Sequence, residues 1–321
     1  MNSLIIPVYK NAENIRPLLD ALSDLNRNTV DLEVIFVVDG SPDASAALLA
    51  ELLPNSGLNA QLLLLSRNFG SYAAIRAGLV AARGERFAVM AADLQEPPEL
   101  VTTFFKILTD EPVDIVIGTR ESRADPFLSK LASNTFWSLY KKFVVNEMPE
   151  GGVDVFGCNL AFRDQLLKLD ESHSSLVALL FWMGFRRKVV SYSRVARQHG
   201  KSAWTLKKKY TYFKDSIFSF TDVPIKFLTW VGTIGILFSV VMALIVVVGR
   251  LTGWVTVPGY SATVLAVIFF GATNLLGLGI IGTYAWRTYE NTKRRPFALV
   301  MSKVDFPSAN PYSSSNQRGD S

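Results

Sequence analysis

The sequence predicts an α/β protein: a domain built on a mostly parallel sheet, followed by a membrane-associated C-terminal part. Two observations carry this prediction. In the first half of the chain, short apolar runs alternate with helical patterns, which is typical of a parallel sheet covered on both faces by helices. The second half holds two long uncharged segments, and the chain is unusually apolar, with 49% hydrophobic residues, 19% charged residues and a mean hydropathy of +0.24.

Each predicted strand is followed by a predicted helix. The strand and helix ranges alternate as 3–9 and 13–25, 32–38 and 43–53, 61–65 and 72–82, 87–92 and 97–108, and 114–118 and 127–145. In open parallel sheets, ligands bind outside the carboxyl ends of the strands. The functional residues are therefore expected directly after the predicted strands.

Polar and charged residues stand at those positions. Asp39 follows the second predicted strand, Arg67 the third, and Asp93 with Gln95 the fourth. Oxygen ligands such as Asp93 and Gln95 suit Mg²⁺ or Mn²⁺, and arginine suits phosphate. This set predicts a nucleotide site in which a divalent ion holds the diphosphate. Asp43, in the same loop as Asp39, is interpreted as a helix N-cap.

Several other classes of protein are excluded by missing motifs. Residues 1–204 contain no Gly-x-Gly-x-x-Gly, no Walker lysine loop and no Gly-x-Ser-x-Gly elbow. The single cysteine, Cys158, precludes an internal disulfide, and with only two histidines it precludes a typical structural zinc site. Residues 1–185 hold 15 basic and 23 acidic residues, so a uniformly basic nucleic-acid-binding surface is not expected.

A basic segment separates this acidic part from the apolar one. Residues 186–214 include ten basic residues and no acidic one. From Leu206 to Phe220, apolar residues recur at helical spacing with lysines between them, which predicts an amphipathic helix on an anionic membrane surface. A helix packed on the domain itself would give a similar pattern. Asp215 is expected to be an ion-pair partner on this helix.

The two uncharged segments predict a membrane hairpin. Residues 227–248 form 22 uncharged positions, and residues 251–286 are uncharged too, with a Gly/Pro-containing turn near 254–259. About 20 apolar residues cross a bilayer as a helix. The alternative is a pair of helices buried in a soluble core. Because basic residues flank the outer ends of the pair, both termini and the N-terminal domain are expected in the cytoplasm, at the inner (plasma) membrane.

Seven short motifs follow one another along the chain. They are Ile5-Ile6-Pro7-Val8-Tyr9-Lys10-Asn11 with Glu13-Asn14, Val38-Asp39-Gly40-Ser41, Arg67-Asn68-Phe69-Gly70, Asp93-Leu94-Gln95-Glu96-Pro97-Pro98-Glu99, Gly118-Thr119-Arg120, Gly151-Gly152-Val153-Asp154, and Arg197-Gln198-His199-Gly200-Lys201-Ser202-Ala203-Trp204. Together they resemble family 2 glycosyltransferases with the GT-A fold. The resemblance is closer to the polyprenyl-phosphate glycosyltransferases, which include GtrB-type bacterial glucosyltransferases and dolichyl-phosphate mannose synthases, and it covers about residues 3–295.

The resemblance implies a role for individual residues. They are Pro7, Tyr9, Glu13, Asp39 and Arg67 at the nucleotide, Asp93 and Gln95 at the Mg²⁺ or Mn²⁺, Arg197, Lys201 and Ser202 at the lipid phosphate, and Asp93, Asp154 and Arg120 in catalysis. Two positions depart from the family pattern. Val38 and Ala91 stand where the family commonly has aspartate, and Ala91 removes one potential metal ligand.

The reaction implied by the resemblance is attack of a lipid phosphate oxygen on the anomeric carbon of a nucleotide sugar. It would invert that carbon and release the nucleoside diphosphate. Since a phosphate monoester has a second pKa of about 6, the acceptor is largely ionised at neutral pH and needs no strong base. Glucose from UDP-glucose, undecaprenyl phosphate and a role in cell envelope glycosylation are expected. The alternatives are mannose transfer from GDP-mannose to a dolichyl or polyprenyl phosphate, and a catalytically silent membrane scaffold.

The resemblance and the composition together divide the chain into four parts. These are a GT-A domain at 1–204, an interfacial helix at 205–222, a transmembrane hairpin at 223–287 and a cytoplasmic tail at 288–321. The tail after Val304 is rich in Ser, Asn and Pro, and disorder is expected there. Glycines in the second uncharged segment permit a homo-oligomer. A processive polysaccharide synthase is not expected, because the Gln-x-x-Arg-Trp motif is absent.

Overall fold

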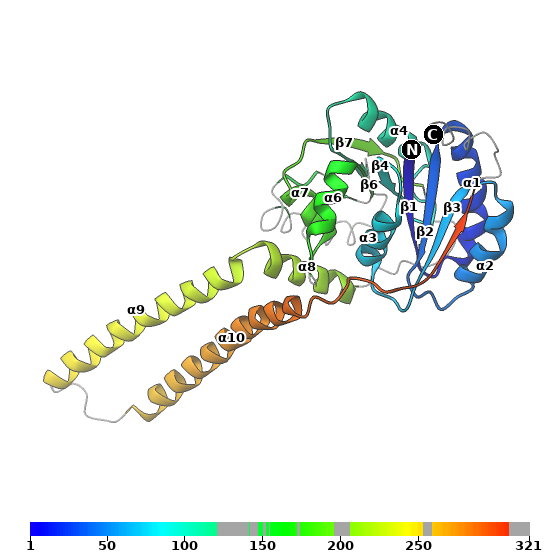
Figure 1. Cartoon of the computed structure of the whole chain (residues 1–321). Helices are drawn as coiled ribbons and strands as arrows, with labels where there is room; N and C mark the ends of the chain where they lie inside the picture. Colours follow the sequence, from blue (N-terminus) through cyan, green and yellow to red (C-terminus); the bar gives the residue numbers. More distant parts are fainter. Residues whose placement is uncertain are drawn as a thin grey trace, which may run out of the picture. The chain divides into compact units, whose positions relative to one another are not determined.

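The computed structural model describes residues 1–120, 141, 147–149, 152–153, 155–171, 174–195, 206–252 and 259–307 (Figure 1). The chain forms two compact units. The sheet unit comprises Met1–Glu171, Ser175–Lys208 and Arg295–Ser321, and the helical unit comprises Ser172–Ser174 and Lys209–Arg294. The helical unit is therefore inserted, in sequence, between two parts of the sheet unit.

In the described part of the chain, the sheet unit holds an eight-stranded sheet in the order β7-β5-β6-β4-β1-β2-β3-β8. Only β6 and β8 run antiparallel to their neighbours. The predicted α/β class with a mostly parallel sheet is thus confirmed. The strands are β1 (Asn2–Val8), β2 (Leu32–Val38), β3 (Asn59–Leu65), β4 (Arg86–Val89), β5 (Ile115–Arg120), β6 (Val155–Asn159), β7 (Arg187–Tyr192) and β8 (Val300–Phe306).

Helices cover both faces of the sheet, as the alternating pattern predicts. α1, α2 and α4 pack on one face, while α3 and α6 pack on the other (Figure 1). The helix expected at 127–145 lies outside the described residues. The helical elements of this unit are η1 (Ala12–Asn14), α1 (Ile15–Asn28), α2 (Ser45–Leu52), η2 (Leu53–Asn55), α3 (Ser71–Ala81), α4 (Glu99–Asp110), α6 (Leu160–Lys168) and α7 (Leu176–Trp182).

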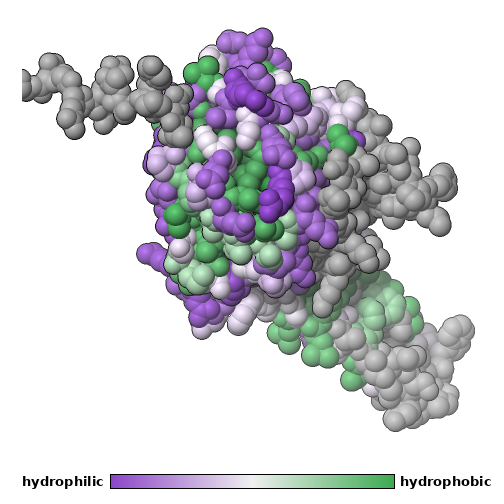
Figure 2. Space-filling model, turned by 90° about the vertical axis from the view of Figure 1, so that its right-hand side faces the viewer, coloured by the Kyte–Doolittle hydropathy of each residue, from purple (hydrophilic) through white to green (hydrophobic). Residues whose placement is uncertain are grey.

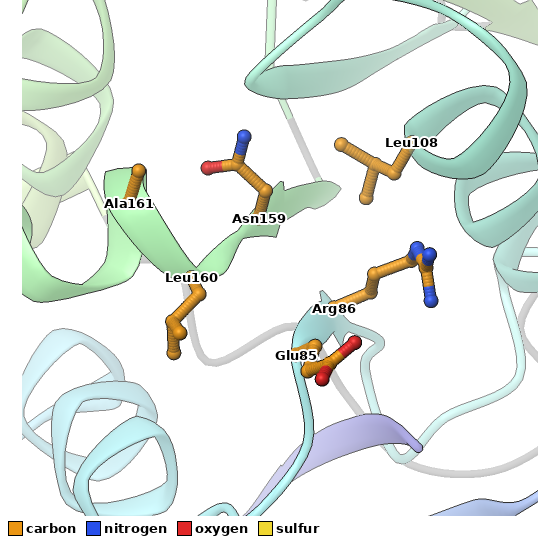
Figure 3. Close-up of a pocket in the computed structure, with 6 residues that line it drawn as sticks. All are labelled: Glu85, Arg86, Leu108, Asn159, Leu160 and Ala161. Carbon is orange, nitrogen blue, oxygen red and sulfur yellow. The ribbon is translucent and has the colours of Figure 1, made fainter.

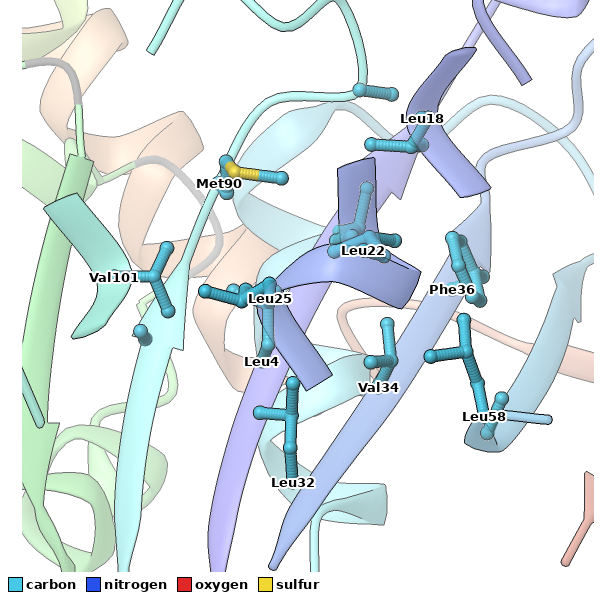
Figure 4. Close-up of a cluster of buried hydrophobic side chains, with 14 of the residues drawn as sticks. Leu4, Leu18, Leu22, Leu25, Leu32, Val34, Phe36, Leu58, Met90 and Val101 are labelled. Atoms are coloured by element: carbon cyan, nitrogen blue, oxygen red, sulfur yellow. The ribbon is translucent and has the colours of Figure 1, made fainter. Parts of the chain in front are cut away.

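The core lies between α1 and the central strands (Figure 4). Leu18, Leu22 and Leu25 recur at the four- and three-residue spacing that places side chains on one face of a helix. All three pack in one cluster with Val34 and Phe36 of β2. All seven residues of β2 are buried, and six of the seven are apolar, as expected for a strand covered on both faces. The buried strands hold the loops at their carboxyl ends in fixed positions.

Asp114 joins three strands at the edge of the sheet opposite the carboxyl ends of the parallel strands. One carboxylate oxygen accepts from Asn159 Nδ2 and Arg186 Nη2, both at 2.9 Å, and the other accepts from Arg186 Nε at 2.9 Å and its backbone N–H at 3.2 Å. Asp114 precedes β5, Asn159 ends β6 and Arg186 precedes β7. The hydrogen bonds from Arg186 hold the pKa of Asp114 below its usual value, although burial opposes the shift.

Asp114→Asn is expected to lower the free energy of unfolding by about 2 kcal/mol at neutral pH, because hydrogen bonds to a charged group contribute about 1.5–3 kcal/mol. The folded-state pKa lies below the unfolded value of about 3.9, so the stabilisation is complete above that value and is lost as the pH falls through the folded-state pKa. Unfolding of both proteins should be measured from neutral pH down to about pH 3. A stability difference that does not shrink at acid pH would contradict this.

β8 corrects the expectation for the C-terminal tail. Val300–Phe306 pairs antiparallel with β3 and extends the sheet, so the disorder expected after Val304 does not hold for Asp305 and Phe306. The strand was missed because an edge strand needs little apolar alternation, and the Ser, Asn and Pro that follow dominate the local composition. The rest of the tail, from residue 308, lies outside the described residues.

The helical unit contains most of α8 (Leu206–Phe220) together with α9 (Val223–Leu251) and α10 (Tyr260–Thr292). The ion pair expected at Asp215 is confirmed: its carboxylate lies 2.7 Å from Arg287 Nη2 of α10. Arg287 also donates to Ser219 Oγ at 2.8 Å, so α8 and α10 are tied together.

α9 and α10 occupy the two segments for which a membrane hairpin is predicted. Their described surface is mostly apolar (Figure 2), with Trp230, Leu237 and Leu278 each about two-thirds exposed. Within the described residues, however, no helix is both long enough and apolar enough to cross a membrane.

Candidate active site

The loops after β2 and β3 are joined by Asp39. Its side chain is buried, with 3% exposed, and each carboxylate oxygen accepts one backbone N–H, from Phe69 at 2.7 Å and from Gly70 at 2.8 Å. Charge-assisted bonds of this kind are the stronger ones in proteins. Asp39 therefore holds the 66–70 loop in place. The sequence predicted a place for Asp39 at the nucleotide, but it did not predict this structural role.

Gly40 allows these two loops to approach closely. Its φ is +55°, and a Cβ at this position would lie 2.3 Å from the carbonyl carbon of Arg67. A side chain is thus excluded both by the backbone conformation and by the space. The Asp39-Gly40 pair in the sequence has a structural reason as well as the functional one implied by the resemblance.

Asp43 joins the loops after β1 and β2. One oxygen accepts from the hydroxyl groups of Ser41 and Ser45, at 2.6 and 2.7 Å, and the other accepts from the backbone N–H of Ala12 at 3.0 Å. Burial alone would raise the pKa of Asp43, but these hydrogen bonds lower it. The predicted N-cap is wrong in position, since Ala44 is the cap, although Asp43 does accept the N–H of Ser45 in the first turn.

The other residues predicted to bind the nucleotide lie in or after β1 and after β3. Pro7 lies in β1, Tyr9 follows that strand, and Glu13 lies exposed in η1. The guanidinium of Arg67 lies 4.1 Å from the centre of the Phe69 ring at the exposed rim of the 66–70 loop. The loops after β1, β2 and β3 are thus brought together by Asp39 and Asp43, as expected for strands whose carboxyl ends share one edge of the sheet.

The loop after β4 carries the predicted metal ligands. Leu94, between Asp93 and Gln95, has a φ of +53°, an uncommon conformation for a residue with a side chain. Such strain clusters at functional sites. The Gln95 side-chain oxygen accepts from Arg194 Nη2 at 2.5 Å, and the backbone N–H of Val195 donates to the carbonyl of Gln95 at 3.0 Å. The segment after β7 is therefore held against the metal-candidate loop.

Arg194 is a site residue that the sequence analysis missed. Its guanidinium bonds to Gln95 and lies 3.9 Å from the buried carboxylate of Glu96. The signal was available, because Arg194 closely follows a strand just as Arg67 and Asp93 do. It was missed because β7 was not predicted.

Of the other predicted site residues, Arg120 is the one that the structure describes. Arg120 is the last residue of β5 and pairs in register with Tyr192 of β7, so it lies at the same edge of the sheet. Asp154, Arg197, Lys201 and Ser202 lie outside the described residues.

The residues after β4 suit a divalent ion by their chemistry. Within the described residues no group of three or more His, Cys, Asp or Glu side chains comes together. Mg²⁺ needs no such group, because it commonly takes one or two protein oxygens and completes its shell with substrate phosphates and water. The Asp93 carboxylate and the Gln95 amide oxygen fit that requirement, although Gln95 accepts from Arg194 in this structure.

A pocket of about 310 Å³ lies away from this edge (Figure 3). It is lined by Glu85, Arg86, Leu108, Asn159, Leu160 and Ala161. Arg86 is the first residue of β4, so the pocket lies at the amino end of the parallel strands. The amide of Asn159 is already engaged with Phe162 N–H and Asp114, both at 2.9 Å. The pocket contains none of the predicted site residues.

The fold and this edge define an α/β enzyme of the GT-A type. A family model described as Glycosyl transferase family 2 matches residues 3–169, a range that spans β1 to β6 and the loops described above. The chain belongs to glycosyl transferase family 2.

Three relatives are similar over almost the whole chain. An uncharacterized glycosyltransferase of Synechocystis sp. is 32% identical over 303 residues, 93% of this chain and 94% of the relative. The undecaprenyl-phosphate 4-deoxy-4-formamido-L-arabinose transferase of Edwardsiella ictaluri is 27% identical, covering 94% of both chains. The bactoprenol glucosyl transferase of Shigella phage SfX is 26% identical, covering 94% of this chain and 99% of the relative.

Proposed function

We propose that the protein transfers glucose from UDP-glucose to undecaprenyl phosphate, giving a polyprenyl-phosphate sugar and UDP. The observation that carries this proposal is the similarity to relatives named for bactoprenol and undecaprenyl-phosphate sugar transfer, which extends over 94% of the chain. The similarity therefore includes the helices after the sheet as well as the family 2 domain.

The donor nucleotide is proposed to bind at the loops after β1, β2 and β3. Asp39 uses one lone pair of each oxygen for Phe69 and Gly70. Since a carboxylate oxygen has a second lone pair, Asp39 can still accept from the N–H of a base. Pro7, Tyr9 and Glu13 flank the same edge, and Arg67 supplies positive charge beside it.

The diphosphate is proposed to lie over the loop after β4. Asp93 and Gln95 would hold Mg²⁺ or Mn²⁺, which when bound neutralises charge on the departing diphosphate. Arg120, the last residue of β5, and Arg194, which follows β7, supply further positive charge at this edge. Preorganised charge of this kind is commonly the largest contribution to catalysis.

The acceptor phosphate is proposed to bind Arg197, Lys201 and Ser202. These residues follow Arg194 closely in the chain, and Arg194 is fixed to the loop after β4. Asp154 is proposed to orient the acceptor or to accept a proton from it. Because the acceptor phosphate is already largely ionised at neutral pH, little proton removal by Asp154 is needed.

The helical unit is proposed to attach the enzyme to the cytoplasmic face of the inner membrane, with α8 at the surface and α9 and α10 crossing. The 22 uncharged residues at 227–248 support this. So does β8: it follows α10 and pairs with β3, so the chain returns to the side of the membrane on which the sheet unit lies. A chain that returns to the same side must cross the membrane an even number of times, and the two helices α9 and α10 provide two crossings.

The protein purified in detergent with Mn²⁺ should transfer label from UDP-glucose into the organic phase only when undecaprenyl phosphate is present. GDP-mannose is offered in a parallel reaction, and each reaction is repeated with the metal chelated. Label from UDP-glucose that depends on both lipid and metal is the expected result. If only GDP-mannose serves as a donor, the proposed donor is wrong. If label is transferred without undecaprenyl phosphate, the proposed acceptor is wrong.

A further inference from the structure

The chain after α10 returns to the sheet beside the donor-site loop. The carbonyl of Leu299, just before β8, accepts the backbone N–H of Ser66 at 3.0 Å. Ser66 directly follows β3 and directly precedes Arg67. The first residue of the 66–70 loop is thus held from outside by the C-terminal segment 297–306.

The same segment also contacts the chain directly after this loop. Phe297 packs edge-on against Tyr72, with ring centres 5.5 Å apart, and the Arg76 guanidinium lies 4.4 Å from the centre of the Phe297 ring. Tyr72 is the second residue of α3, and α3 begins immediately after Gly70. The C-terminal segment therefore supports the 66–70 loop at both of its ends.

The first three residues of the loop, Ser66, Arg67 and Asn68, are exposed. On its inner side the loop is fixed by Asp39, whose carboxylate accepts the N–H groups of Phe69 and Gly70, and by the close approach of Gly40. Asp39 thus holds the N–H groups of Phe69 and Gly70 from the inner side, while segment 297–306 contacts the chain at the two ends of the loop. The positions of these N–H groups, and with them the orientation of Asp39, depend on both sets of contacts.

We propose that segment 297–306 is a positioning element of the donor site: it fixes the 66–70 loop, and through that loop the Asp39 carboxylate that receives the base. The inference rests on the proposed function in its assignment of these loops to the donor. Because Phe297 follows the end of α10 after a short link, the segment also connects the helical unit in sequence to the donor-binding loop.

The test is Phe297→Ala in the full-length protein. Amide hydrogen exchange at Phe69 and Gly70 is expected to accelerate, and the Kd for UDP to rise about 3- to 10-fold, which lies within the range found when a coupling residue without ligand contact is changed. The KM for the donor should rise in parallel while kcat changes little. Phe297→Tyr keeps the ring against Tyr72 and Arg76, so it should restore both slow exchange and nucleotide affinity.

Asp305→Asn is the matched control at the other end of the segment. A carboxylate oxygen of Asp305 lies 3.0 Å from Arg83 Nη2. Arg83 Nε in turn lies 2.7 Å from a carboxylate oxygen of the buried Glu33. This ion-paired group lies at the edge of the sheet remote from the 66–70 loop. This variant should lower the melting temperature without changing UDP affinity or exchange at Phe69 and Gly70. If Phe297→Ala behaves in the same way, the segment only stabilises the fold and the proposal is overturned.

The exchange measurement separates this inference from the proposed function. If the unmodified protein binds no UDP, the proposed donor class is wrong, and the exchange rates alone decide whether segment 297–306 positions the loop. Unchanged exchange at Phe69 and Gly70 in Phe297→Ala overturns the inference whatever the donor is.

Discussion

Asp93→Ala is expected to reduce sugar transfer by about 10²- to 10³-fold, the loss seen when a group that stabilises transition-state charge is removed. Asp93 carries the carboxylate proposed to hold the metal, and Ala91 stands where the family commonly has a second one. The fold should survive the change, because Asp93 is only partly buried and lies in a loop, outside the strands and helices of the sheet unit.

The measurement is initial velocity at saturating donor and lipid over a range of Mn²⁺ concentrations. Asp110→Ala is a matched control, because it removes the same charge from the exposed end of α4. It should retain full activity. Normal turnover by Asp93→Ala would remove the metal assignment, whereas activity recovered only at high Mn²⁺ would support it.

The predictable part of the fold is the part with short-range signals. The first five strands, and the helices that follow the first four of them, were predicted because apolar runs alternate with amphipathic patterns at close spacing. The edge of the sheet that carries Asp39, Arg67 and Asp93 followed from the rule that ligands bind at the carboxyl ends of parallel strands. β6, β7 and β8 were missed. β6 is a short antiparallel strand containing Gly157, and β7 and β8 are edge strands with exposed polar residues.

The partners of the site residues could not be predicted, because they are distant in sequence. Asp39 binds N–H groups 30 and 31 residues away, and Gln95 accepts from an arginine 99 residues away. Residue types suggest what a side chain can bind, but only the folded chain shows which groups it already binds. Asp43 illustrates the point: its carboxylate was predicted as a local cap, yet it also accepts the N–H of Ala12, the first residue of η1 and 31 residues away.

Asp39→Ala is expected to abolish measurable nucleotide binding and to lower the free energy of unfolding by about 3 kcal/mol, since two buried charge-assisted hydrogen bonds are lost together. Asp39→Asn should be nearly as damaging. An amide has a single acceptor oxygen, so its NH₂ group would face one of the two N–H donors of Phe69 and Gly70. The measurements are the Kd for UDP and chemical unfolding of the same preparations.

Loss of stability alone could weaken binding, so the control must be similarly destabilised elsewhere. Asp114→Asn serves this purpose, because Asp114 also accepts several hydrogen bonds but lies at the opposite edge of the sheet. If the two variants lose similar stability and only Asp39→Asn loses UDP affinity, the effect belongs to the donor site. Equal losses of affinity would mean that Asp39 acts only through the fold, and the proposed contact between Asp39 and the base would have to be abandoned.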